Sequence, residues 1–371
     1  VGERTLVLVR EKEGTFVIDF EELDLQIMTD EQNNWSAAFG DLSKIYERSE
    51  LLRTYNIRSG SLTLSSASGN KPYYFRADIV SPYSLLIEDG AIRNRLFISG
   101  SLTEEGVSAV INTNIHVNYE DNTLAIRSWD VGYDIKEVKK LVDQLLPSDG
   151  DAEENNSGIN VRLTAENSTI VLSPQTRLPA DKINLEYGDQ KVTVSLEHGE
   201  GIIELERVGG ISFFNGENLN EEFMTALLRG SYVQGGTLAL AGMGTEEEVS
   251  AVIEVKETVL MNSKTLNNIM TLLNTIPALV TLSVPEYQTK GVSIRSAVAG
   301  LQYSQGQVEV KSISVDTPVM QLAGKGVIDL SQETIDMDIQ LASQAGKNLR
   351  KIPVVGYVVA GKEEDISATF K

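Results

Sequence analysis

Residues 298–341 read VAGLQYSQGQVEVKSISVDTPVMQLAGKGVIDLSQETIDMDIQL, and apolar and polar side chains alternate almost throughout this stretch. A period of two is typical of strands that have one dry face and one wet face. Turn-forming residues interrupt the alternation at Gln305–Gly306, Asp316–Pro318, Gly324–Gly326 and Ser331–Glu333. The stretch therefore predicts a meander of about four short antiparallel strands.

Short strand patterns of the same kind recur along the rest of the chain. They are separated by turn residues every ten or so positions. Apolar residues at helical spacing occur instead in the segments 36–55, 133–146, 219–229 and 263–276, with Asp41 or Ser43 placed to cap the first. We therefore expect about twenty strands and four or five short helices, without the βαβ alternation of a doubly wound fold.

Composition limits the classes of partner. The 371 residues allow one large domain or two to three ordinary ones, and 41% hydrophobic with 23% charged residues is ordinary for a globular protein. The net charge of -21 argues against nucleic acid as a partner, because phosphate backbones would be repelled. There are no cysteines, which excludes disulfides and thiolate metal sites.

The acidic, polar segment 148–158 (SDGDAEENNSG) is the best linker candidate. It divides the chain into a first meander with short helices, 1–147, and a second meander, 159–371. We interpret it as a mobile loop within one architecture, since the strand pattern resumes unchanged beyond it. A long hairpin loop is the alternative.

No catalytic or nucleotide-binding motif occurs, and we predict no enzyme, no metal and no cofactor. His116 and His198 each lie in or beside a strand pattern, as surface histidines usually do. The residues Gly242–Gly244 follow a strand and are interpreted as a turn. Alternation places Asp329, Asp336 and Asp338 on the solvent side of their strands.

Strands with one apolar face need a cover, and two architectures supply it. A second sheet can close over the first as a sandwich, or the sheet can curl and leave an apolar trough. The pattern alone favours the sandwich. It does not settle which alternate set of side chains faces inward, because a shift of one residue exchanges the two faces.

Three motifs in the C-terminal third favour the trough. They are IPAL at residues 276–279, G-x-G-x-IDL at residues 324–330, and IP-VG at residues 352–356. In this order they resemble the C-terminal region of the AsmA-like superfamily, in particular the large YhdP-like envelope proteins of Gram-negative bacteria. The resemblance is clear over residues 220–371, whereas the first two hundred residues match only in style.

The resemblance implies a mainly β fold with a few short helices. The expected form is an elongated, curled antiparallel β-sheet, a taco-like β-groove with helices at its ends or covering it. The implied role is non-enzymatic: holding phospholipid acyl chains for transport from the inner to the outer membrane, with phospholipid or another acyl lipid as ligand. It further implies a periplasmic location and an inner-membrane anchor in a segment outside this sequence. The alternative is a structural or interaction β-sandwich scaffold in the cell envelope.

The resemblance also suggests which residues carry these roles. The C-terminal end would contact a membrane surface or an envelope protein partner through an amphipathic helix and an apolar segment, formed by Leu266, Ile269, Met270, Leu273, Ile276, Ile352, Val354 and Val355. Ordinary core is the alternative for both. Groove-lining positions are Val308, Val310, Ile313, Val315, Val327, Ile335, Met337, Ile339 and Leu341.

Overall fold

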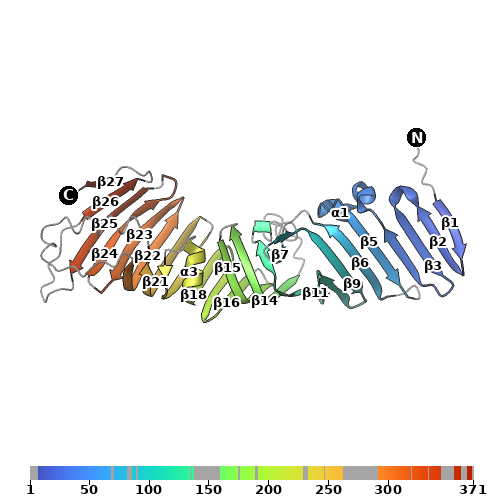
Figure 1. Cartoon of the computed structure of the whole chain (residues 1–371), viewed down its shortest axis with the longest axis horizontal. Coiled ribbons are helices and arrows are strands. Elements are labelled where there is room, and N and C mark those ends of the chain that lie inside the picture. The colour runs from blue at the N-terminus through green and yellow to red at the C-terminus, as the bar shows by residue number, and fades with distance from the viewer. Residues whose placement is uncertain are drawn as a thin grey trace. The chain divides into compact units, whose positions relative to one another are not determined.

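The computed structural model consists of two compact units, Val1–Asp189 and Gln190–Lys371. Its described residues form 27 strands and a few short helices, and the sheet of each unit is open (Figure 1). These residues are 7–67, 71–81, 86–88, 91–134, 136–137, 159–173, 176–188, 191–228, 233–245, 247–261, 291–318, 320–332, 334–343, 355–360 and 366–369.

The first unit begins with an antiparallel meander in which each strand pairs with the next. Two short strands, β7 (Leu86–Glu88) and β8 (Ala91–Arg93), form a side hairpin, and β7 pairs with β13 (Gly132–Asp134). The meander strands are β1 (Val7–Lys12), β2 (Thr15–Phe20), β3 (Leu25–Asp30), β4 (Trp35–Phe39), β5 (Gly60–Ser66), β6 (Tyr73–Val80), β9 (Arg95–Leu102), β10 (Gly106–Ile111), β11 (Ile115–Glu120) and β12 (Thr123–Trp129).

One pairing departs from the expected antiparallel order. The long strand β14 (Asn160–Ser173) runs parallel to both β12 and β13, and antiparallel to β15 (Thr176–Gly188). Parallel neighbours need a crossover connection of a dozen or more residues, and the chain between Asp134 and Asn160 has that length. The candidate linker 148–158 lies in this connection, outside the described residues. The strands on either side of it, β12 and β14, pair with each other and therefore belong to one sheet.

The second unit is an antiparallel meander throughout. A two-residue strand, β19 (Val233–Gln234), pairs with one end of β21. The meander strands are β16 (Lys191–His198), β17 (Gly201–Val208), β18 (Ile211–Leu219), β20 (Thr237–Gly244), β21 (Glu248–Leu260), β22 (Val292–Ser304), β23 (Gln307–Asp316), β24 (Met320–Asp329), β25 (Thr334–Ser343), β26 (Val355–Ala360) and β27 (Ile366–Thr369).

Two predicted turns are wrong, because their residues belong to strands. Gly324–Gly326 lies within β24, and Gly242–Gly244 ends β20. None of these glycines has a positive φ, so they do not serve as turn residues. At Gly326 a side chain would instead collide with the Asp336 carbonyl on β25, so the glycine allows the two backbones to pair closely.

The described helices are short. The segment 36–55 starts with strand β4 and then forms η2 (Leu42–Arg48) and α1 (Glu50–Thr54), while η1 spans Glu21–Leu23. Asp41 is the predicted cap: its side chain accepts a hydrogen bond from Ser43 N at 2.9 Å. The helix expected over 219–229 is α3 (Glu221–Leu228).

The two remaining predicted helices, 133–146 and 263–276, fall almost wholly outside the described residues. Of the first, Tyr133 and Asp134 end β13, whereas Lys136 and Glu137 are helical. Among the described helices, none combines the length and the apolar character that crossing a bilayer requires.

Packed core is local in the first unit. Leu42 and Leu52, from η2 and α1, pack on Ile79 of β6 together with Phe39 and Leu96. A second cluster joins Ile115 and Val131 with Ile111, Val117 and Ile126. Short helices thus cover one end of a sheet face, and the rest of that face continues beyond them.

Candidate functional site

An apolar face crosses the sheet of the second unit from strand to strand. Residues that are directly opposite each other in register project from the same side of a sheet. The pairings Leu301–Val310, Val310–Gly326 and Gly326–Met337 therefore place four residues in one row. Continued in the other direction, the row contains Val194, Leu205, Phe214, Gly242, Ala251 and Leu301.

Eight of the nine predicted lining positions are brought together by this register. A second row joins Ala299, Ile313, Gly324 and Ile339, and Leu341 takes the position opposite Leu322. The eight positions are Val308, Val310, Ile313, Val315, Ile335, Met337, Ile339 and Leu341.

Val327 is the exception and belongs to the opposite face. It pairs with Glu309 and Asp336, and 38% of its surface is exposed. The error follows from the supposed turn at Gly324–Gly326: because the strand continues, the inward positions are Leu322, Gly324, Gly326 and Ile328. Because two of these four residues are glycines, the hydrophobicity pattern does not show which side of the strand they face.

The apolar face is partly shielded from solvent. Val310 is buried, at 4% exposure, while Leu301, Ile313 and Met337 are half-buried. Valines on the other face are far more exposed, and Val252 reaches 52%. In a sandwich a second sheet about 10 Å away would bury most of the inner face. Among the described residues of this unit the strands instead form one open sheet, so the closed sandwich is not the fold.

Large and small residues alternate across the rows of this face. Gly242 sits between Phe214 and Ala251, and Gly326 sits between Val310 and Met337. The Phe214 ring lies over Gly242, with Cε2 2.8 Å from where a Cβ would be. An aromatic ring shields an otherwise bare glycine in this way. Larger side chains of this face therefore lie over the glycine positions beside them.

Helix α3 covers one end of this face. Leu219 and Phe223 have no exposed surface, and Met224 has 2%. Asn220 caps the helix by accepting hydrogen bonds from the backbone N–H groups of Glu222 and Phe223, at 3.1 and 3.2 Å. The tight packing ends there, so the described part of α3 closes an edge of the face and leaves the rows described above open.

The first unit carries a face of the same kind. It lies in the part of the chain whose resemblance to the AsmA-like superfamily is only in style. One of its rows runs through ten neighbouring pairs of strands. The signal that marks it is the same alternation, but the row becomes visible only once register is known. It comprises Ile18, Ile27, Ala37, Leu64, Phe75, Gly100, Ala109, Val117, Ile126, Leu163 and Leu185.

The opposite face of the second unit, called the polar face below, carries charged side chains together with exposed apolar ones such as Phe213 and Val252. Asp336 and Asp338 are exposed, as predicted, and ion pairs at 2.9 and 2.6 Å join Lys256 to Glu254 and Lys311 to Glu309. Asp329 anchors the β24–β25 turn. Hydrogen bonds from Ser331, Gln332 and Gln307 lower its carboxyl pKa to about 2.

The two histidines have structural neighbours. His116 stacks edge-on against Trp129 at 5.0 Å between ring centroids. His198 Nε2 lies 2.9 Å from Glu222 Oε2, beside the ring of Phe223. Within the described ranges, no three His, Asp or Glu side chains gather in an arrangement that would hold a metal ion.

The predicted end segments fall mainly outside the described residues. Leu266, Ile269, Met270, Leu273, Ile276, Ile352 and Val354 all do so. Val355 begins β26 and pairs in register with Ile339 of β25, and β26 pairs in turn with β27.

Comparison with known proteins gives one finding. A protein-family model described as "YhdP protein" matches residues 104–369, which is most of the chain. No curated protein and no solved structure matches the chain.

Proposed function

We propose, from the premise that the chain belongs to the YhdP protein family, that it is a lipid-binding module of a bacterial envelope protein. Its ligand would be phospholipid or another acyl lipid, and its action would be transfer without chemistry. The observation that carries the proposal is the apolar face of the second unit, which runs row after row across the strands and remains partly open.

Such a face suits an acyl chain better than a compact ligand. An extended chain of methylenes gains roughly 0.8 kcal/mol for each CH₂ removed from water, and any apolar strip supplies that gain. The row from Phe214 to Met337 carries no polar side chain. No specific polar partner is needed along the strip, so a lipid can occupy it in many registers and slide.

The polar side of the sheet fits an aqueous compartment. Exposed carboxylates such as Asp336 and Asp338 keep that side hydrated, and the net charge of -21 opposes self-association. We propose the periplasm of a Gram-negative bacterium, with anchorage to the inner membrane through a segment outside this sequence. Phospholipid would pass from the inner toward the outer membrane, and the C-terminal end would meet a membrane surface or an envelope protein partner.

Two substitutions with a matched control test lipid binding. The purified chain is examined by native mass spectrometry, and lipid is extracted from the same sample. Val310→Asp and Ile339→Asp place a charge on the apolar face, whereas Val327→Asp places the same charge on the polar face. We expect co-purifying phospholipid in the unchanged chain and in Val327→Asp, and its loss in the other two.

Circular dichroism of all variants establishes that the sheet is retained. A folded chain that carries no lipid and takes up no fluorescent phospholipid would refute the proposal, as would equal loss of lipid in all three variants. The open sheet would then serve as a scaffold of the envelope.

A further inference from the structure

A cleft of about 430 Å³ lies on the polar face of the second unit and a larger one, of about 700 Å³, on the polar face of the first. The larger cleft lies over β5, β6, β9 and β10, on the side opposite the apolar row. Its lining combines two arginines, one carboxylate, one exposed aromatic ring and several hydroxyl groups. The smaller cleft has no aromatic side chain in its lining.

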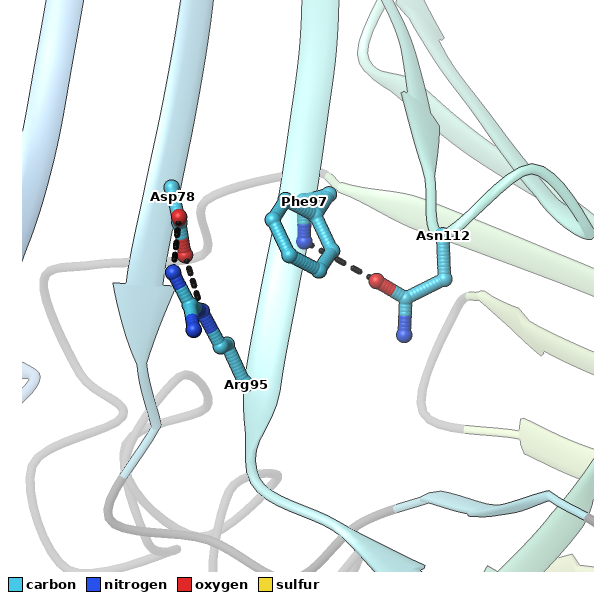
Figure 2. A network of polar contacts seen from close by, with 4 residues as sticks. All are labelled: Asp78, Arg95, Phe97 and Asn112. Atoms are coloured by element: carbon cyan, nitrogen blue, oxygen red, sulfur yellow. Dashed lines mark hydrogen bonds and ion pairs between the residues drawn. The ribbon is translucent and has the colours of Figure 1, made fainter.

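An ion pair between Arg95 and Asp78, which both line this cleft, lies next to Phe97 (Figure 2). Arg95 Nε and Nη2 donate to the two carboxylate oxygens of Asp78 at 2.8 and 2.6 Å. These bonds hold the pKa of the Asp78 carboxyl below its ordinary value. A bidentate pair of this type has defined geometry, so the guanidinium plane is oriented rather than free to rotate.

Phe97 lies next to that pair and is uncovered. Alternation would put a polar residue on this face, yet 55% of the Phe97 surface is exposed. The Arg95 guanidinium lies 5.2 Å from the ring centroid, and the Phe97 backbone N–H donates to Asn112 Oδ1 at 2.9 Å. The hydrogen bond positions the Phe97 backbone, the Arg95 guanidinium lies over the ring, and the ring itself stays exposed.

Arg76 supplies a positive charge on the same face. It lies opposite Thr63 and Ser99, whose small side chains form the floor beside it. Its guanidinium makes no ion pair or hydrogen bond within the part of the chain that the structure describes. Arg76 lies opposite Ser99 on the neighbouring strand β6. Phe97 lies two positions before Ser99 on the same strand, β9. A ligand resting over Ser99 would meet a cation on one side and an aromatic ring on another.

We infer that this cleft binds a saccharide that carries one carboxylate or phosphate group. The anion would pair with Arg76, the C–H-rich face of the sugar ring would pack on Phe97, and sugar hydroxyls would exchange hydrogen bonds with Ser61, Thr63 and Ser99. A chain of net charge -21 repels a polyanion, which favours a ligand with a single anionic group. This site is separate from the proposed lipid face, since that face belongs to the second unit and the cleft lies in the first, on the side opposite the first unit's own apolar row.

Saturation-transfer NMR on the full chain tests the site with glucuronate and glucose 6-phosphate as probes and glucose as the uncharged reference. We expect signal from both acidic sugars and at least threefold less from glucose. Arg76→Gln should weaken binding of both acidic sugars about three- to tenfold. Phe97→Ala should abolish the signal from the C–H face of the sugar ring.

Arg127→Gln is the control for charge alone. Arg127 lies on the same polar face of β12, opposite His116, and removing it changes the net charge equally. We expect it to bind both acidic sugars as the unchanged chain does. Equal losses in Arg76→Gln and Arg127→Gln, equal signal from glucose, or displacement of glucuronate by an equal concentration of inorganic phosphate would each overturn the proposal. Lipid content of the same samples reports on the proposed lipid face, so the two proposals fail independently.

Discussion

Gly326 and Met337 lie directly opposite each other in the β24–β25 pair, and a Cβ on the glycine would lie 2.7 Å from the Met337 Cα. The same Cβ would collide with the Asp336 carbonyl. Because both obstacles are backbone atoms, neither can move aside without shifting a strand. The close approach of these two strands therefore depends on the absence of a side chain at one position of the apolar face.

Substituting this glycine should destabilise the second unit. We expect Gly326→Val to lower its free energy of unfolding by about 1–3 kcal/mol, as overpacking does in well-packed structures. Gly300→Ala is the matched control, since its Cβ would meet nothing closer than Ser312 Oγ at 3.4 Å. Urea unfolding followed by circular dichroism measures both. An unchanged midpoint for Gly326→Val would show that the strands separate easily.

Phe223 and Phe213 allow a test of where the second unit has a packed core. Phe223 on α3 has no exposed surface, whereas 44% of the Phe213 surface is exposed on the opposite side of the sheet. We expect Phe223→Ala to cost about 3–5 kcal/mol of unfolding free energy. Phe213→Ala should stay within about 0.5 kcal/mol of the unchanged chain. Similar losses in the two variants would contradict the assignment of α3 as a core element.

The sequence was sufficient where side chains alternate without interruption. A bulge between Val310 and Ile313, which was not predicted, brings two pairs of residues onto one face. Within each pair, Val308 with Val310 and Ile313 with Val315, the shared face was predicted, because residues two apart in a strand project to the same side. The third helix was predicted for the same reason, since the apolar spacing after Asn218 is helical and Asn220 caps it. Local physics determines both features, so one sequence reveals them.

Features that depend on pairing between distant residues were missed. Gly324–Gly326 looks like a turn until β25 lies beside it, and this error sent Val327 to the wrong face. The parallel pairing of β12 with β14 depends on a crossover that no pattern marks. The cleft at Phe97 joins residues from β6, β9 and the end of β10, whose proximity follows from register alone.

Acid should loosen the turn between β24 and β25. The Asp329 pKa of about 2 lies below the ordinary value of 3.8, so the folded state favours the ionised carboxyl. The stabilisation is complete above about pH 5, and it is lost as the pH falls from about 4 through 2. Asp329→Asn removes the charge but keeps an acceptor. Its melting temperature should lie below that of the unchanged chain at pH 7, and the difference should shrink toward pH 2.

This prediction has a built-in control at the neighbouring strand. Asp336 is exposed on the same face, and the sheet places no turn at it. Asp336→Asn is therefore the control for the loss of one carboxylate outside the turn. A difference for Asp329→Asn that stays constant from pH 7 to pH 2 would mean that ionisation of this carboxyl does not stabilise the turn.

Neighbouring residues on β25 separate the two faces of the proposed lipid module most sharply. Ile339 belongs to the row with Gly324 and Ile313, and Asp338 pairs with Lys325 on the polar side. A photoreactive amino acid at position 339 should cross-link acyl lipid in cells, and the same group at position 338 should not. The two positions are adjacent in the same strand, so they differ in the face of the sheet to which the side chain projects. Lipid adducts of equal yield at both positions would mean that lipid meets the sheet without preference, and the apolar face would lose its assigned role.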